Sequence, residues 1–500
     1  MTVSFKTIVV LFALMMGISA AQLIRLSFFP HTASYQLSPE QQRQDINQLL
    51  TEINQKSAFA ALDPIRKHTF NQQALLLLSA NLQSSNAVDF QIRLQRWISS
   101  VNDPAISVDL PSRMKQLSNI KQLPVQLQYD GQHWLAYTAE NKPIDEEFPY
   151  LTHMDGLPMP RWEKAAQRYI PDSIKLSAKE QSHWLHRINQ LRLDIGLVTS
   201  NSVVLTFANT EGNSTQRKID LVSINQQREN TQQVMPATIT AQPSSNPQRI
   251  VRYPANPRLA SPILEQLALS DSKQDLLLDI RHLSAPDIAL TQWLQNHFAP
   301  QRSLYNNTIG LIKYKRYPQS TAKIFTTNNF EPLEKLNFFE QVHLETFGFN
   351  NHIQDSPSFS HWLVRSENNA SENNTREINQ PNPRKLVLLV DSSCQQECEW
   401  LALMASAWPN VQLVGEKTRG SLSPRHYAAL KQSGIKVSFS AALAYSAQGK
   451  LVSGIGISPS ISLNDLALNH ENITQLIAAK SSSPAHISSA NTLATAKRSP

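Results

Sequence analysis

The apolar pattern of the C-terminal half constrains the fold more than any other feature of this 500-residue chain. Three short runs are apolar almost throughout, and stretches with helical spacing follow the first two of them. Such runs are typical of strands buried on both faces, as in a parallel sheet covered by helices. The alternation therefore predicts an α/β core with largely parallel strands. The runs lie at 276–280, 386–390 and 411–414, and the helical stretches at 288–294 and 399–408.

The chain before this core divides into a helical part and a β-rich part. The segment Ser38–Gln41 has the form of a helix N-cap, and apolar residues then recur at helical spacing. From Val125 the period changes to two, and Asp130-Gly131 has the form of a hairpin turn. We interpret residues 36–120 as a small helical domain and residues 121–235 as a β-rich region.

Polar stretches separate these parts and interrupt the core. Gln, Asn, Pro and Ser are abundant before the first core strand, and Ser, Glu, Asn and Thr fill a second run inside the core. Segments of this composition bury too little apolar surface to pack, so we expect exposed loops. The resulting division is a linker at 236–270, a core at 271–478 with a polar insertion at 366–384, and a flexible tail at 479–500.

The charge and composition narrow the class of protein. The formal net charge of +7 comes from basic residues that are scattered along the chain. A nucleic-acid-binding surface needs a basic patch or stripe, so we expect no nucleic-acid partner. Charged residues make up 17% of the chain, against about 25% in typical soluble domains, whereas Asn, Gln and Ser are abundant. This composition is typical of an exported surface.

The N-terminus has the form of a signal peptide. Lys6 precedes 18 uncharged residues, and Ser19-Ala20-Ala21 offers small residues to a signal peptidase. We therefore place a cleaved signal at residues 1–21, and the alternative is an uncleaved membrane anchor. Both predict a periplasmic location, either free or anchored in the inner membrane. The membrane is a partner only if the segment is retained.

Cys394 and Cys398 are the two cysteines of the chain, and an exported protein meets an oxidising compartment. A disulfide across this short loop is one prediction, and a pair of buried free thiols is the other. Two thiols without a nearby histidine pair make an incomplete zinc site, so we expect no metal.

Glycine is scarce and clustered. The chain has 13 glycines in 500 residues, or 2.6%, against an average of about 7%, and six of them lie between Gly415 and Gly456. Loops that cradle phosphates or oxyanions need glycine where the backbone approaches a ligand. We therefore expect no cofactor, and we place any backbone-driven chemistry in this stretch.

Four core segments carry motifs in a consistent order, and a fifth segment lies upstream. The segments are Leu276–Arg281, a strand ending in Asp-Ile-Arg; Val387–Glu399, a strand and turn leading into a helix; Val414–Gly420, with Gly-x-x-Thr-x-Gly; Gly454–Pro459, with Gly-x-Gly-Ile-x-Pro; and, upstream, Met154–Met159. Together they resemble the C-terminal processing, or tail-specific, serine protease family, in which the upstream segment is similar to a PDZ-like one. The resemblance implies a ClpP/crotonase-like α/β core, preceded by a small helical domain and a β-rich, PDZ-like region.

The resemblance also implies attack on a peptide bond by a serine hydroxyl, with a lysine as base in many members. The position that should hold the serine, three residues before Glu399, is Gln396. The position of the lysine, one residue after Gly420, is Ser421. Glutamine is not a nucleophile, and a serine hydroxyl does not replace an amine as base. In addition, His282-Leu283-Ser284-Ala285 replaces the glycines whose backbone would approach the oxyanion.

Other side chains are fallback candidates for the missing groups. Ser393 and its neighbour Ser392 lie at a predicted strand end, and His282 would serve as a base if the two elements adjoin. The alternative is that the serines satisfy turn groups and the histidine has no chemical role. Cys394 is a nucleophile only if it is unbonded, and we expect Lys417 in its turn to be solvated.

We therefore expect a degenerate family member that keeps the scaffold, has lost peptidase chemistry and binds peptide or protein. Its expected partner is an unfolded polypeptide or an envelope protein. The alternative function is an active serine-type endopeptidase with rearranged catalytic groups. A third hypothesis, a structural envelope protein, depends on an uncleaved N-terminal anchor.

Overall fold

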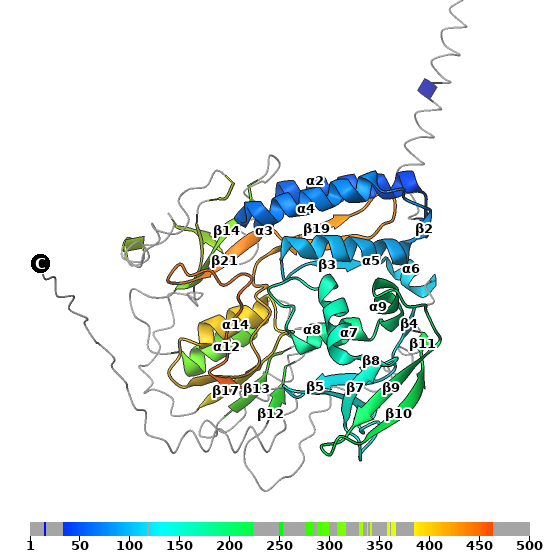
Figure 1. Cartoon of the computed structure of the whole chain (residues 1–500). Helices are drawn as coiled ribbons and strands as arrows, with labels where there is room; N and C mark the ends of the chain where they lie inside the picture. The colour runs from blue at the N-terminus through cyan, green and yellow to red at the C-terminus, as the bar shows by residue number, and fades with distance from the viewer. Residues whose placement is uncertain are drawn as a thin grey trace, which may run out of the picture.

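The computed structural model shows three packed parts of the chain (Figure 1). N-terminal helices lie across the top of this view, a sheet with its helices lies at the lower right, and the α/β core lies at the left. Most of the predicted signal segment, the polar insertion beyond Ser366 and the tail at 479–500 lie outside the described residues. The described residues are 15–16, 34–117, 120–223, 250–253, 276–281, 283, 288–299, 308–316, 330–333, 338, 341–342, 358–360, 362–366 and 385–463.

The N-terminal part begins with the predicted cap. The Ser38 hydroxyl accepts a hydrogen bond from the Gln41 backbone N–H at 3.3 Å, and the Gln41 side chain accepts one from the Ser38 N–H at 2.9 Å. The helices that follow pack through apolar faces, and the rings of Phe70 and Trp97 stack with centroids 4.6 Å apart. The elements are β1 (Gln36–Leu37), α2 (Pro39–Lys56), α3 (Ala58–Leu62), α4 (Pro64–Ser79), β2 (Ser85–Asn86), α5 (Ala87–Ile98), η1 (Ser99–Val101), β3 (Ser107–Asp109) and α6 (Ser112–Leu117).

The second part is an antiparallel sheet in the order β10-β9-β7-β6-β5, with helices packed against it (Figure 1). The predicted hairpin is present, because β5 pairs with β6 on either side of Asp130-Gly131. Trp162 is fully buried, and its indole donates to Met154 O at 2.9 Å. The PDZ-like character of this part stays a prediction. The elements are β4 (Lys121–Gln122), β5 (Gln126–Tyr129), β6 (Trp134–Tyr137), β7 (Tyr150–Met154), β8 (Leu157–Pro158), α7 (Met159–Ala166), η2 (Gln167–Tyr169), α8 (Ala178–Leu185), α9 (Ile188–Asp194), β9 (Ser202–Ala208), β10 (Ser214–Asp220) and β11 (Val222–Ser223).

The core contains the parallel sheet that the apolar runs predict. Its strand order is β12-β13-β17-β18-β22, and every neighbouring pair is parallel. All residues of β13 and β17 are buried, as expected for central strands. The predicted α/β fold class is confirmed. The elements are β12 (Ile250–Arg252), β13 (Leu276–Asp279), α12 (Ile288–Phe298), β17 (Leu386–Val390), α14 (Glu397–Ala405), β18 (Val411–Gly415) and β22 (Ile461–Ser462).

Two features of the core differ from the sequence analysis. β12 lies inside the predicted linker at 236–270, yet it adds a strand to the parallel sheet, because three residues are too few to produce a periodic signal. A second, antiparallel sheet in the order β15-β16-β14-β21 has no counterpart in the predicted pattern. Its strands are distant in sequence, so only the folded chain pairs them. They are β14 (Thr308–Tyr314), β15 (Glu331–Pro332), β16 (Leu363–Ser366) and β21 (Ala442–Ser446).

The N-terminal part and the core share a three-stranded sheet. β3 comes from the predicted helical domain and pairs with β20 (Lys436–Ser440), which also pairs with β19 (Arg425–Ala429). Asp103 is fully buried beside this sheet and accepts hydrogen bonds from the Ser440 N–H at 2.6 Å and hydroxyl at 2.8 Å. A backbone ladder and a buried carboxyl therefore fix the N-terminal part on the core.

Clustered glycines allow two backbone segments of the core to cross. Gly420 and Gly456 have φ values of 83° and 78°, in the left-handed region that favours glycine. A Cβ on Gly456 would lie 2.2 Å from the carbonyl oxygen of Thr418. The Gly454 N–H also donates to Gly420 O at 2.8 Å. The turn that ends at Gly420 therefore rests directly on the closing Gly-x-Gly segment.

We expect Gly456→Ala to lower the free energy of unfolding by about 3 kcal/mol or more, since a Cβ adds a backbone clash to an unfavourable φ. Gly449→Ala is the matched control, because Gly449 has a φ of 74° but nothing within 4 Å of its Cβ position. That variant should lose about 1 kcal/mol. Urea unfolding measures both losses, and equal losses would contradict the close crossing.

Candidate functional site

Gln396 occupies a strained turn between a core strand and a helix. The chain leaves β17 at Val390 and enters α14 at Glu397, and Gln396 between them has φ 50° and ψ −113°. Residues with a Cβ rarely adopt this conformation unless surrounding contacts enforce it. A sharp strand-to-helix turn of this kind is the geometry that presents a nucleophile at the end of a sheet. Here the residue at the turn is a partly exposed glutamine.

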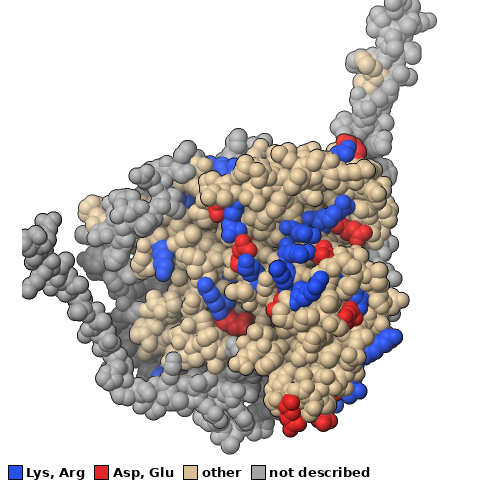
Figure 2. Space-filling view, viewed as in Figure 1, with Lys and Arg blue, Asp and Glu red and all other residues tan. Residues whose placement is uncertain are grey.

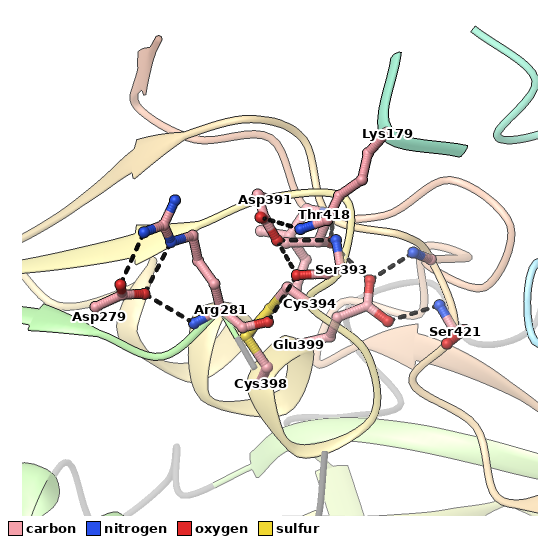
Figure 3. Close-up of a disulfide and its surroundings, with 12 residues drawn as sticks. Lys179, Asp279, Arg281, Asp391, Ser393, Cys394, Cys398, Glu399, Thr418 and Ser421 are labelled. Carbon is pink, nitrogen blue, oxygen red and sulfur yellow. Dashed lines mark hydrogen bonds and ion pairs between the residues drawn. A yellow bond between two sulfur atoms is a disulfide. The ribbon is translucent and has the colours of Figure 1, made fainter. Parts of the chain in front are cut away.

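A disulfide brackets Gln396. Cys394 and Cys398 are bonded, with Cα atoms 5.3 Å apart, and both residues are fully buried (Figure 3). The Cys398 N–H donates to Leu283 O at 3.2 Å, which connects the bracket to the segment after β13. A covalent link between the residues two before and two after Gln396 restricts the backbone at the turn. The disulfide therefore helps to hold the strained conformation.

Ser421 lies directly beside Gln396. The Gln396 N–H donates to Ser421 O at 3.1 Å, so the fold brings together the two positions where the resemblance implies a nucleophile and a base. Ser421 is 1% exposed, and its hydroxyl accepts a hydrogen bond from Arg425 at 3.2 Å. The site is thus assembled, but the amide of Gln396 is no nucleophile, and the buried hydroxyl of Ser421 is bonded to an arginine, which is not a base that could activate it.

The buried carboxyl of Glu399 holds this arrangement together. It accepts hydrogen bonds from the Thr418 hydroxyl at 2.6 Å and from the backbone N–H groups of Gly420 and Ser421 at 2.5 and 2.6 Å. Burial raises the pKa of Glu399 to about 7, although the three donors favour its charged form. Because Glu399 lies in the first turn of α14, it ties the Gly-x-x-Thr-x-Gly turn to the helix that begins after Gln396.

Arg419 connects the same turn to the other two parts of the molecule. Its Nε donates to Pro104 O at 2.7 Å, and its guanidinium forms an ion pair with Glu180 of α8. Its backbone N–H donates to Cys394 O at 3.2 Å. One residue therefore links the turn, the disulfide loop, the N-terminal part and the second part.

Arg425 is a site residue that the sequence analysis missed. It begins β19, and its Nη2 donates to the side-chain oxygen of Gln395 and to the Ser421 hydroxyl. The guanidinium therefore bonds to the residue before Gln396 in sequence and to the residue whose carbonyl accepts from the Gln396 N–H. A single arginine in a polar stretch belongs to no periodic pattern or motif, so nothing in the sequence singles it out. An arginine keeps its proton and is not a base.

The fallback candidates do not form a catalytic pair among the described residues. The Ser393 hydroxyl donates to Asp391 Oδ1 and lies 3.0 Å from Arg281 O, as Figure 3 shows. Asp391 is in turn paired with Lys179 at 2.9 Å. A carboxylate paired with a lysine is a poor base for an alcohol. His282 lies outside the described residues.

The remaining candidates are not placed for catalysis either. Ser392 is buried, and its hydroxyl has no hydrogen-bond partner within the described part of the chain. Cys394 is bonded to Cys398 and is therefore not a free thiol. Lys417 is exposed, next to the buried Thr418.

Two further predictions concern metal binding and a membrane anchor. The described residues contain no group of three or more His, Cys, Asp or Glu side chains that could hold a metal ion. Within the same residues, no helix is both long and apolar enough to cross a membrane. The expected absence of a metal and of a cofactor stays a prediction.

Comparison with solved structures identifies the fold. Mature CPAF in complex with lactacystin has a TM-score of 0.54 and 13% identity, over 88% of this chain and 97% of its own. A mutant of CPAF has a TM-score of 0.56 and 12% identity, over 88% and 96%. The chain has the fold of CPAF. The resemblance that the motifs indicate is therefore confirmed.

The other comparisons give no further support for the fold. The photosystem II D1 C-terminal processing protease matches over 87% of this chain and 96% of its own, with 12% identity and a TM-score of 0.40. No family model matches the sequence, and no curated protein matches it. At 12–13% identity the CPAF structures establish the fold alone, so the chemistry has to be argued from the residues of the site.

The raised pKa of Glu399 predicts a pH-dependent stability. The folded-state value of about 7 lies above the ordinary value of 4.5, so the folded chain binds this proton more strongly between these limits. The contribution of this group to the free energy of unfolding is therefore fully present below pH 4.5 and is lost as the pH rises through 7. The total loss is on the order of 3 kcal/mol. Glu399→Gln should remove this loss.

The measurement is urea unfolding of wild type and Glu399→Gln at pH 5 and pH 8. At pH 5 the variant should be less stable by about 1–3 kcal/mol, because an amide cannot accept all three hydrogen bonds. The gap between the two proteins should narrow at pH 8. Other titrating groups cancel in this difference. A gap that widens at pH 8 would show that the carboxylate is the favoured form.

Proposed function

We propose that this chain is an exported protein that binds polypeptide at the site of a tail-specific protease without cleaving it. The observation that carries the proposal is the turn at Gln396, which keeps a nucleophile-presenting geometry and adjoins Ser421. Covalent catalysis needs a nucleophile activated by a positioned base, but Gln396 is no nucleophile, and the buried Ser421 hydroxyl is bonded to Arg425, which is not a base. A kept scaffold with altered reacting groups supports binding as the retained function.

An open strand edge beside the site supports a polypeptide ligand. Among the described residues β19 is an end strand of its sheet, and hydrogen bonds at Pro424 and Leu430 lie at the two ends of its ladder with β20. Because antiparallel ladders alternate, the backbone groups of Arg425 and Tyr427 face away from β20. An extended peptide binds such an edge by adding a strand. The edge begins four residues after Ser421 and is closed further along, where Gln48 donates to Ala429 O at 3.0 Å.

The disulfide supports export. A disulfide persists in oxidising compartments and is rare in the cytosol. The bond between Cys394 and Cys398 lies at the candidate site itself, so reducing conditions would loosen the very turn on which the proposal depends. An unfolded polypeptide or an envelope protein is the partner that fits a periplasmic location.

The absence of peptidase chemistry is tested with a fluorophosphonate probe and a fluorescently labelled unfolded polypeptide. We expect neither labelling nor turnover by the wild-type protein, because Gln396 cannot be acylated and the Ser421 hydroxyl is buried beside an arginine that cannot act as its base. A known active serine protease, assayed in parallel, shows that the probe and substrate work. Labelling that disappears in Ser393→Ala would instead establish the rearranged endopeptidase.

The role of the strand edge is tested by Tyr427→Pro. Proline removes the N–H that faces the open edge, and edge positions of this kind tolerate it. We expect the affinity for the unfolded polypeptide, measured by fluorescence anisotropy, to fall about tenfold. Tyr427→Ala is the matched control, since it removes the side chain, which is 68% exposed, but keeps the backbone donor. Similar affinities for Tyr427→Pro and Tyr427→Ala would rule out strand addition at this edge.

A further inference from the structure

Arg425 is a largely buried cation without a carboxylate partner among the described residues. Its hydrogen bonds go to two neutral acceptors, the Gln395 amide oxygen and the Ser421 hydroxyl. Its Nε is buried and has no hydrogen-bond partner in the described part of the chain. Burial lowers the pKa of Arg425, as expected when a charge is poorly compensated. A cation in this setting favours binding of an anion.

Asp103 and Glu399, the two carboxyl groups whose charges act on Arg425, do not neutralise it by direct contact. Asp103 accepts hydrogen bonds from Ser440 and from the Ala105 N–H at 2.9 Å. Glu399 accepts its three from the turn at 418–421. Burial raises the pKa of both groups and so favours their neutral forms. Neither forms an ion pair with Arg425 in the described residues.

Gln396 supplies a second group with free hydrogen-bonding capacity at the same place. Its side chain does not cap α14, and no described residue bonds to its amide. The N–H of Gln396 contacts Ser421, and the residue before it, Gln395, bonds to Arg425. Arg425 and the backbone of Gln396 therefore both bond to Ser421, and both residues are partly exposed.

The charge on this face would favour approach of an acidic ligand. Figure 2 shows Lys and Arg side chains gathered near the middle of the face, around the junction of β3 and α8, with fewer acidic ones among them. Arg419 and Lys179 at this junction each pair with one carboxylate, Glu180 and Asp391. Arg425 adds a charge that no ion pair cancels within the described part of the chain. A locally positive surface raises the rate at which anions associate.

We propose that Arg425, with the amide of Gln396, binds a carboxylate of the polypeptide ligand. A guanidinium offers a planar fork of donors that matches a carboxylate, and the amide of Gln396 would add a neutral donor. This inference rests on the proposed polypeptide-binding function and names the chemical group that the site selects. The carboxylate comes either from an acidic side chain or from the C-terminus of the ligand.

The experiment uses the full-length mature protein and three labelled peptides of one uncharged sequence, all blocked at the N-terminus. The first has a free C-terminal carboxylate, the second has a C-terminal amide, and the third has a C-terminal amide and one central glutamate. Fluorescence anisotropy at fixed salt gives the Kd of each peptide for wild type, Arg425→Gln and Arg425→Lys. Lys218→Gln, at an exposed position of β10, is the control with the same loss of charge.

We expect wild type and Lys218→Gln to bind at least one carboxylate peptide tenfold or more tightly than the plain amide. Arg425→Gln should lose this preference, so that all three peptides bind this variant with similar Kd values. Arg425→Lys should retain part of the preference, because lysine keeps the charge but not the fork. If the peptide with the free C-terminus binds more tightly than the glutamate peptide, the site selects a C-terminal carboxylate. The reverse order shows selection of a side-chain carboxylate. Thermal unfolding confirms that each variant is folded.

The outcomes separate the two proposals. If all three peptides bind wild type equally, polypeptide binding stands and the carboxylate site is wrong. If Arg425→Gln is folded and keeps the wild-type preference, Arg425 is a structural support for Gln395 and Ser421 and not a binding residue. If no peptide and no unfolded polypeptide binds wild type, the proposed function fails and this inference fails with it.

Discussion

The rest of the site depends on the hydrogen bonds that the buried carboxyl of Glu399 accepts. Glu399 stands in the first turn of α14 and collects three hydrogen bonds from residues 418–421, so one side chain joins a helix to a turn that follows a different strand. If the Glu399 side chain pointed into solvent instead, the backbone N–H groups of Gly420 and Ser421 would stay buried without acceptors, which costs about 1–3 kcal/mol each. Ser421 lies against Gln396 because this contact fixes the distance between the two segments.

The requirements of this scaffold differ from the requirements of catalysis. The crossing at Gly420 and Gly456, the disulfide around Gln396 and the ties made by Arg419 all concern backbone position. Catalysis depends in addition on which side chain the turn presents. A chain can therefore change that side chain and keep the scaffold. In this chain the strained turn is present, and the side chain on it is that of a glutamine.

Much of the fold could be predicted from local pattern. The apolar runs indicated the central parallel strands, and the cap at Ser38 indicated α2. The antiparallel sheet around β14, the pairing of β3 with β20 and the position of Arg425 could not be predicted this way. Each of them depends on contacts between residues far apart in sequence, and local spacing carries no information about such pairings.

The sequence by itself determined which side chains stand at positions 396 and 421, because residue identity does not depend on the fold. Only the tertiary structure decided that these two residues touch, that Gln396 is held at a positive φ, and that an arginine without a carboxylate partner in the described residues lies beside them. The physical reason is that strain, burial and charge compensation belong to neighbours in space. Those neighbours are set by the path of the chain through Glu399 and the glycine crossing.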